Sequence, residues 1–234
     1  MKDILEDKAV KLDSAFIASL VFDLIKGMAF LHSSDIKVHG NLKSPNCVIT
    51  SRWVLQVTDF GLRPLRNLVL KEYDSEDEFF KDLLWTAPEL LRAEEIGATQ
   101  KGDVYAFGII LHEFVTRQGV WGNCAVEPRD IIIRIKSRVV LRPALRDLEA
   151  QDYVISCMQK CWSENPEDRP TFVEIKDQLK KMRDGMVKVN IMDNMICLLE
   201  KHANNLESQV SERTMQLELE KKRTENLLHR MLPK

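Results

Sequence analysis

The chain changes character at Gly185. Beyond this residue glycine disappears and proline returns only at Pro233, so no helix-breaking residue interrupts the segment that follows. Apolar residues recur there in alternating steps of three and four residues, the spacing of a coiled-coil seam. Ten of the thirteen seam positions are apolar: Val189, Met192, Ile196, Leu199, Ala203, Leu206, Val210, Leu217, Leu227 and Met231. The pattern predicts a long helix over residues 186–234 that pairs with a second helix.

The three remaining seam positions are polar and lie close together: Arg213, Glu220 and Thr224. Polar residues in a seam lower its stability and set register or oligomeric state. We therefore expect this half of the coil to be weaker and more adjustable, and to act as a switch. A single helix that packs back on the preceding domain is the alternative.

Residues 1–185 have the length and apolar content of one globular domain, which we expect to be mostly helical. A broad apolar arc predicts a buried helix over 14–34, which Ser14 can cap. Two short apolar runs at 47–50 and 54–57 predict a small hairpin. The polar, acidic segment 63–84 is typical of a loop. Apolar spacing predicts further helices over 102–117, 130–136, 147–161 and 171–182.

The composition limits the partners. A net charge of −2 with 30% charged residues gives no reason to expect nucleic acid. The start lacks the layout of a signal peptide, and the apolar stretch around 104–115 is broken by His112 and Glu113, so we expect no membrane-spanning helix.

The five cysteines are scattered and odd in number, which favours reduced thiols over a disulfide framework. Cys157 and Cys161 could share one helix face as half of a metal site. A buried structural role is the preferred interpretation, because no second pair of ligands lies nearby in the sequence.

The segment His39-Gly40-Asn41-Leu42-Lys43-Ser44-Pro45-Asn46 follows the pattern of a protein-kinase catalytic loop, and Asp59-Phe60-Gly61 follows it at kinase-like spacing. In the kinase pattern an Asp accepts the proton of the substrate hydroxyl, while the later Asn and the second Asp hold magnesium. Here Asn41 stands where that first Asp is needed, and an amide cannot accept the proton. The metal-binding pair, Asn46 and Asp59, is retained.

Further motifs carry a resemblance to the large lobe of a protein kinase, mainly α with a small β-hairpin (α+β). They are Ala87-Pro88-Glu89, Asp103 at the start of the apolar helix, and Pro166-Glu167-Asp168-Arg169-Pro170. The runs Val38 to Ser44, Asn46-Cys47 and Trp53-Val54-Leu55 resemble the kinase-homology domain of receptor guanylate cyclases. The tail, with Asn204-Asn205-Leu206-Glu207 and Met231-Leu232-Pro233, resembles the dimerising helix, a parallel coiled coil, that precedes the cyclase domain in that family.

The resemblance implies roles for single residues. Lys43 would contact the transferred phosphate in an active kinase, and Asn46 and Asp59 would hold the magnesium of ATP. Glu89 and Arg169 match a structural ion pair that braces the lobe. Asp103 matches a further structural residue of the lobe. ATP with magnesium would then regulate the complete protein, and would bind weakly or not at all to this chain, which lacks the family's small lobe.

The resemblance also implies a function. The segment would be a regulatory pseudokinase, without kinase activity, in a single-pass membrane receptor that forms a homodimer through residues 189–231, a heterodimer being the alternative. It would relay a signal, on the cytoplasmic side, to a cyclase domain that makes cyclic GMP from GTP. That domain, the transmembrane segment and the small lobe are expected outside this sequence. A free scaffold that pairs with a full-length cyclase, and an active kinase of unusual sequence, are the alternatives.

Overall fold

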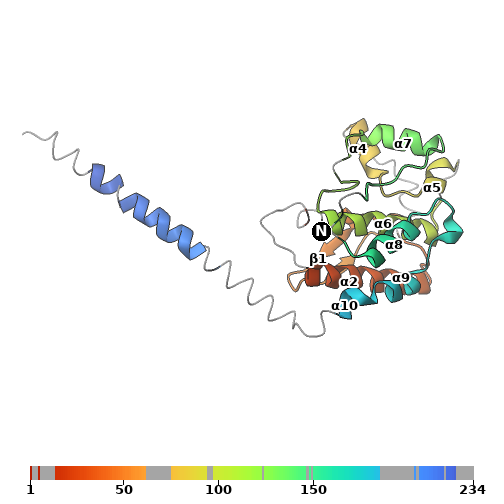
Figure 1. Ribbon diagram of the computed structural model, residues 1–234, viewed down its shortest axis with the longest axis horizontal. Coiled ribbons are helices and arrows are strands. Elements are labelled where there is room, and N and C mark those ends of the chain that lie inside the picture. Colours follow the sequence, from red (N-terminus) through yellow and green to blue (C-terminus); the bar gives the residue numbers. More distant parts are fainter. Residues whose placement is uncertain are drawn as a thin grey trace, which may run out of the picture. The chain divides into compact units, whose positions relative to one another are not determined.

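The chain divides into two units, Met1–Gly185 and Met186–Lys234. The computed structural model describes residues 1, 5, 14–61, 75–93, 97–122, 124–145, 148, 150–184, 203, 206–218 and 220–224. Figure 1 shows the first unit as a group of packed helices around α2 and α6.

Helix α2 (Ser14–Ser33) is one of the two central helices of the first unit and confirms the helix predicted over 14–34. Nine of its residues are buried, and it packs against α6, α9, α10 and strand β2. Its length and apolar composition would also allow it to cross a membrane. The expectation that no helix could span a membrane considered the apolar stretch around 104–115 and did not consider α2. Burial on several sides within the lobe accounts for its apolar composition.

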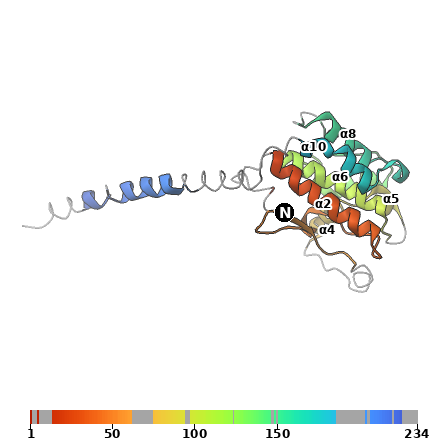
Figure 2. The same cartoon turned by 90° about the horizontal axis from the view of Figure 1, so that it is seen from below.

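Helix α6 (Gln100–Thr116) lies beside α2, as Figure 2 shows. Every residue from Gly102 to Phe114 is buried, so this helix forms the centre of the core. Thr99 caps it by accepting a hydrogen bond from the Gly102 amide at 2.9 Å. A Cβ atom on Gly108 would lie 2.9 Å from the Cβ of Cys161, so glycine allows α8 (Asp152–Cys161) to approach closely.

The predicted hairpin is present and short. Strand β1 (Cys47–Ile49) follows the 3-10 turn η1 (Ser44–Asn46) and pairs antiparallel with β2 (Leu55–Val57), with Val48 opposite Gln56. The hairpin ends two residues before Asp59, so it fixes the distance between the two motifs on either side of it.

The prediction of a loop over 63–84 is wrong for its described second half, because α4 (Glu76–Asp82) lies there. Ser75 caps this helix by accepting from the Glu78 amide at 3.2 Å, and Glu76, Asp77 and Glu78 place negative charge in its first turn. The acidic run that suggested a loop is thus favourable at a helix start. Helix α4 packs against α7 (Pro128–Lys136), which also contacts α5 (Pro88–Arg92).

Two predicted helices have different bounds in the structure. Helix α8 begins at Asp152 and not at residue 147, since Ala150 and Gln151 are not helical. The helix predicted over 171–182 is two helices, α9 (Phe172–Gln178) and α10 (Lys180–Asp184), separated at Leu179. A capping box between Thr171 and Glu174 starts α9, and the turn η2 (Pro166–Asp168) precedes it.

In the second unit the described residues 203, 206–218 and 220–224 are helical, and their described side chains are exposed. The seam residues Leu206, Val210 and Leu217 are 59%, 64% and 66% exposed, as expected for an apolar stripe without a partner in a single chain. Other predicted seam residues lie outside the described residues: Val189, Met192, Ile196, Leu199, Leu227 and Met231. The coiled coil stays a prediction.

Candidate functional site

The loop at 39–46 is anchored to the core by Asp103. This carboxylate is 3% exposed and lies in the first turn of α6, where the helix dipole favours negative charge. Its Oδ2 accepts from the backbone amide of His39 at 2.8 Å, and its Oδ1 accepts from the amide of Gly40 at 2.9 Å. His32 Nε2 lies 3.0 Å from Oδ2. One buried carboxylate from the central helix therefore fixes the start of the loop.

Gly40 is a position where only glycine fits easily. Its φ of +74° is in the left-handed region, and a Cβ atom would lie 2.8 Å from the Cβ of Ala98. The kinase pattern has arginine at this position. The backbone geometry and the nearby Ala98 give a steric reason for glycine here.

Three side chains of the predicted site lie in contact. Asn41 Nδ2 donates to Asp59 Oδ2 at 2.6 Å, and Asn46 Nδ2 donates to the same oxygen at 3.1 Å. Asn46 Nδ2 also donates to the Asn41 carbonyl at 2.7 Å. The Asn46 carbonyl in turn accepts from Thr58 Oγ1 at 3.0 Å. The structure therefore brings together the residue that replaces the catalytic base and the two residues expected to hold magnesium.

Lys43, in the same loop, is engaged in an ion pair. It is 7% exposed, and its Nζ is hydrogen-bonded to Asp82 Oδ1 at the end of α4. The expected phosphate-contacting residue is thus paired within the chain. Asp82 was not predicted from the sequence, because the ion pair joins residues 39 positions apart and no local pattern marks it.

Arg169 and Glu89 form an ion pair joined by two hydrogen bonds. Arg169 Nη1 donates to Glu89 Oε1 at 2.6 Å and Nη2 donates to Oε2 at 2.7 Å. The guanidinium also donates to the carbonyls of Ser163 at 2.9 Å and Lys101 at 3.0 Å. Arg169 is 1% exposed. The pair ties α5 to the segment before α9 and to α6.

Tyr105 lies close to two guanidinium groups. Arg169 lies 5.3 Å and Arg142 5.4 Å from the centre of its ring. Burial raises the pKa of Tyr105 to about 12, although both arginines act in the opposite direction. Arg142 and Arg92 also share Glu164, whose pKa is lowered: desolvation opposes the shift, but the hydrogen bonds from the two arginines outweigh it. This cluster extends the Glu89–Arg169 pair into a brace between α5, α6 and α8.

Cys157 and Cys161 are fully buried in α8. Burial, followed by a hydrogen bond with Cys157, raises the pKa of the Cys161 thiol well above its ordinary value. No group of three or more His, Cys, Asp or Glu side chains in the described part of the chain could hold a metal ion. The burial of Cys157 and Cys161 agrees with the structural role preferred from the sequence.

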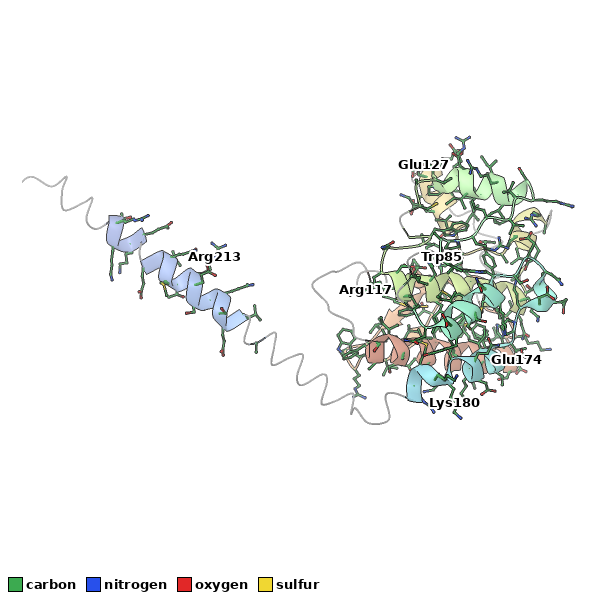
Figure 3. All side chains as sticks on the ribbon, viewed as in Figure 1. Trp85, Arg117, Glu127, Glu174, Lys180 and Arg213 are labelled. Atoms are coloured by element: carbon green, nitrogen blue, oxygen red, sulfur yellow. The ribbon has the colours of Figure 1, made fainter. Side chains whose placement is uncertain are left out.

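The three predicted switch residues lie in the second unit. Arg213, Glu220 and Thr224 are helical and exposed, and Figure 3 labels Arg213 on this helix. Thr224 Oγ1 donates back to the Glu220 carbonyl at 2.9 Å, as a threonine inside a helix commonly does. Nothing in this unit tests their predicted role.

The helical lobe, the short hairpin and the loop held by Asp103 define the large lobe of a protein kinase. Residues 1–179 match the protein tyrosine and serine/threonine kinase family. The receptor-type guanylate cyclase Gyc76C of Drosophila melanogaster is 51% identical over 99% of this chain, which covers 16% of that protein. The resact receptor of Arbacia punctulata is 46% identical over the whole chain, which covers 24% of it. Human atrial natriuretic peptide receptor 2 is 40% identical, again over the whole chain, with 22% of that protein covered.

The chain therefore belongs to the protein kinase family, as a kinase-homology region of the kind found in receptor guanylate cyclases. It spans between about a sixth and a quarter of the length of these relatives.

Proposed function

We propose that this chain is a regulatory pseudokinase segment of a receptor guanylate cyclase. In this role it does not transfer phosphate. It relays an upstream signal through the helix of its second unit to a cyclase domain that makes cyclic GMP from GTP. The relatives named as guanylate cyclases support the class of parent protein.

The observation that carries the proposal is the contact between Asn41 and Asp59. A general base must be able to accept the proton of the substrate hydroxyl, and a side-chain amide cannot do so near neutral pH. The Asn41 amide instead donates to Asp59 at 2.6 Å. Lys43 is paired with Asp82 in the same region. The residue at the base position and Asp59 are thus hydrogen-bonded to each other, and Lys43 is paired with Asp82.

Phosphate transfer is the direct test. The purified chain, and a full-length receptor that contains it, are incubated with γ-labelled ATP, magnesium and a general protein substrate, with an active kinase as the positive control. We expect no label above the level without enzyme. Transfer that is abolished by Asp59→Ala would refute the proposal and would support the active-kinase alternative.

ATP belongs to the proposal as a regulator of the longer parent chain. The contacts that a small lobe makes to adenine would lie outside this sequence, so we expect weak binding to this chain. Titration of both proteins with ATP by calorimetry compares the two, and tight binding to this chain would contradict the expectation.

The coiled coil is the proposed relay. Two chains pair through residues 189–231, and the polar positions Arg213, Glu220 and Thr224 allow the coil to change register when the kinase-like unit changes. Exposed apolar side chains at Leu206, Val210 and Leu217 support pairing with another helix.

Substitution of the three polar seam residues by leucine tests the relay. In a full-length cyclase, Arg213→Leu, Glu220→Leu and Thr224→Leu together should lock the coil and make cyclic GMP output insensitive to the stimulus. The matched control places leucine at three positions off the seam, Glu212, Glu218 and Lys222. Normal stimulation of the seam variant, or equal loss in the control, would count against the relay.

A further inference from the structure

We propose that the amides of Asn41 and Asn46 hold Asp59 in the place of a magnesium ion, so that this site keeps its shape without a metal. The inference rests on the proposed function, because only a chain that transfers no phosphate can dispense with magnesium at this position. It adds a role for Asn41 that the loss of the base alone does not require.

The hydrogen-bond distances establish which ends of the amides face Asp59. At 2.6 Å from a carboxylate oxygen, the nearer atom of Asn41 must be the nitrogen, since an amide oxygen would be repelled at that distance. The Asn46 nitrogen is placed in the same way, because it also donates to the Asn41 carbonyl at 2.7 Å. Asp59 Oδ2 thus receives two N–H donors from one loop.

This donor set does not fit magnesium. The ion takes about six oxygen ligands at roughly 2.0–2.1 Å and favours carboxylates. Here Asp59 is the one carboxylate among the three side chains, and its Oδ2 already accepts from the amide N–H groups of Asn41 and Asn46. Among the described residues, no group of three or more His, Cys, Asp or Glu side chains could hold a metal ion, here or elsewhere.

Asp59 needs such a clamp because of its backbone. Its φ of 66° is in the left-handed region, which is uncommon for a residue with a Cβ atom and which aspartate adopts mainly where its side chain is hydrogen-bonded locally. Hydrogen bonds to an ionised group are among the stronger ones in proteins, so two of them can hold this conformation. In our interpretation the amides supply the positive ends of their dipoles where a kinase uses a cation.

The test is the thermal unfolding of the whole chain in about 1 mM EDTA and in about 10 mM MgCl₂. We expect the wild-type melting temperature to change by less than about 1 °C between the two, because no site binds the ion. Asn41→Asp replaces a donor by a carboxylate beside Asp59. In EDTA it should lower the melting temperature by about 5 °C, and magnesium should recover at least about 3 °C of that loss.

Two further variants separate the clamp from general effects. Asn41→Ala removes the donor without adding charge, so it should lower the melting temperature less than Asn41→Asp and should not respond to magnesium. Asn165→Asp is the matched control: the side chain caps η2 through its oxygen, which aspartate can also do. It adds the same charge away from Asp59 and should gain nothing from magnesium.

Each other outcome overturns the inference. A wild-type chain stabilised by magnesium as much as Asn41→Asp would show that the site takes the metal. Unchanged stability of Asn41→Asp and Asn41→Ala in EDTA would show that there is no clamp. Magnesium that fails to recover Asn41→Asp, or that recovers Asn165→Asp equally, would remove the link to the metal position. None of these results restores phosphate transfer, so the labelled-ATP assay judges the proposed function separately.

Discussion

Arg169→Ala should strongly destabilise the first unit. The side chain is 1% exposed and makes four hydrogen bonds, two to Glu89 and two to backbone carbonyls. Its removal leaves the Glu89 carboxylate and both carbonyls without their donor and takes a cation from the face of Tyr105. Breaking one side of a buried ion pair costs about 3–5 kcal/mol.

The partial exposure of Glu89 limits this figure. Its side chain is 26% exposed, so water can solvate part of the stranded charge, and the loss should lie toward the lower end of that range, about 3 kcal/mol. For a domain of this size each kcal/mol shifts the melting temperature by about 2–4 °C. We therefore expect a fall of roughly 6–12 °C, measured by circular dichroism at fixed protein concentration.

The chain contains a matched control for this experiment. Arg129 and Glu76 also form an Arg–Glu pair, but at 3.7 Å and with side chains 58% and 66% exposed. Arg129→Ala should change the melting temperature by less than about 2 °C, since exposed pairs contribute little. A fall below about 2 °C for Arg169→Ala, or equal falls for both variants, would refute the argument from burial.

Three further predictions concern the loop and the core. Lys43→Met and Asp82→Asn should each speed amide hydrogen exchange in α4, and the double variant should cost less than the sum of the two, because each single change strands a charge. Gly40→Ala should lower the melting temperature by several degrees, because Gly40 has a φ of +74° and the new Cβ atom would lie 2.8 Å from the Cβ of Ala98. Gly119→Ala tests the φ effect alone, because a Cβ atom there would have no other atom within 4 Å. Burial lowers the pKa of His112 below 6.5, although the hydrogen bond with the Ala144 carbonyl opposes this shift. Neutral His112 therefore contributes its full stabilisation above pH 6.5, and this stabilisation is lost as the pH falls toward the pKa of the folded state. Thermal melts between about pH 7.5 and pH 5.5 should therefore show a steeper loss for wild type than for His112→Gln, and parallel losses would contradict this assignment.

The sequence predicted the long elements of the first unit well. Helices α2 and α6 have apolar patterns that few other structures can accommodate, and the hairpin was bounded by clear turn residues. Helix α4 was missed because its acidic first turn was interpreted as a loop, although Ser75 and the three acidic residues are also a helix start. The break at Leu179 has no comparable local signal.

The sequence also indicated the candidate site, since Asn41, Asn46 and Asp59 stand in fixed motifs. It gave no direct information on their contacts. That Asn41 donates to Asp59, or that Lys43 pairs with Asp82, depends on the path of the chain between them and on the rotamers that packing allows. Distances of this kind are decided only when the hairpin and α4 are in place.

By itself, then, the sequence determined the absence of a carboxylate at position 41, the kinase-like order of motifs and the heptad pattern after Gly185, because each is a property of residue identity and spacing. The tertiary structure decided how the remaining polar groups are used. Buried polar groups must find partners when water is excluded, and in this fold they find one another: Asp103 holds the loop, the two amides hold Asp59, and Asp82 holds Lys43. These pairings join residues distant in the chain, so only the folded arrangement could reveal them.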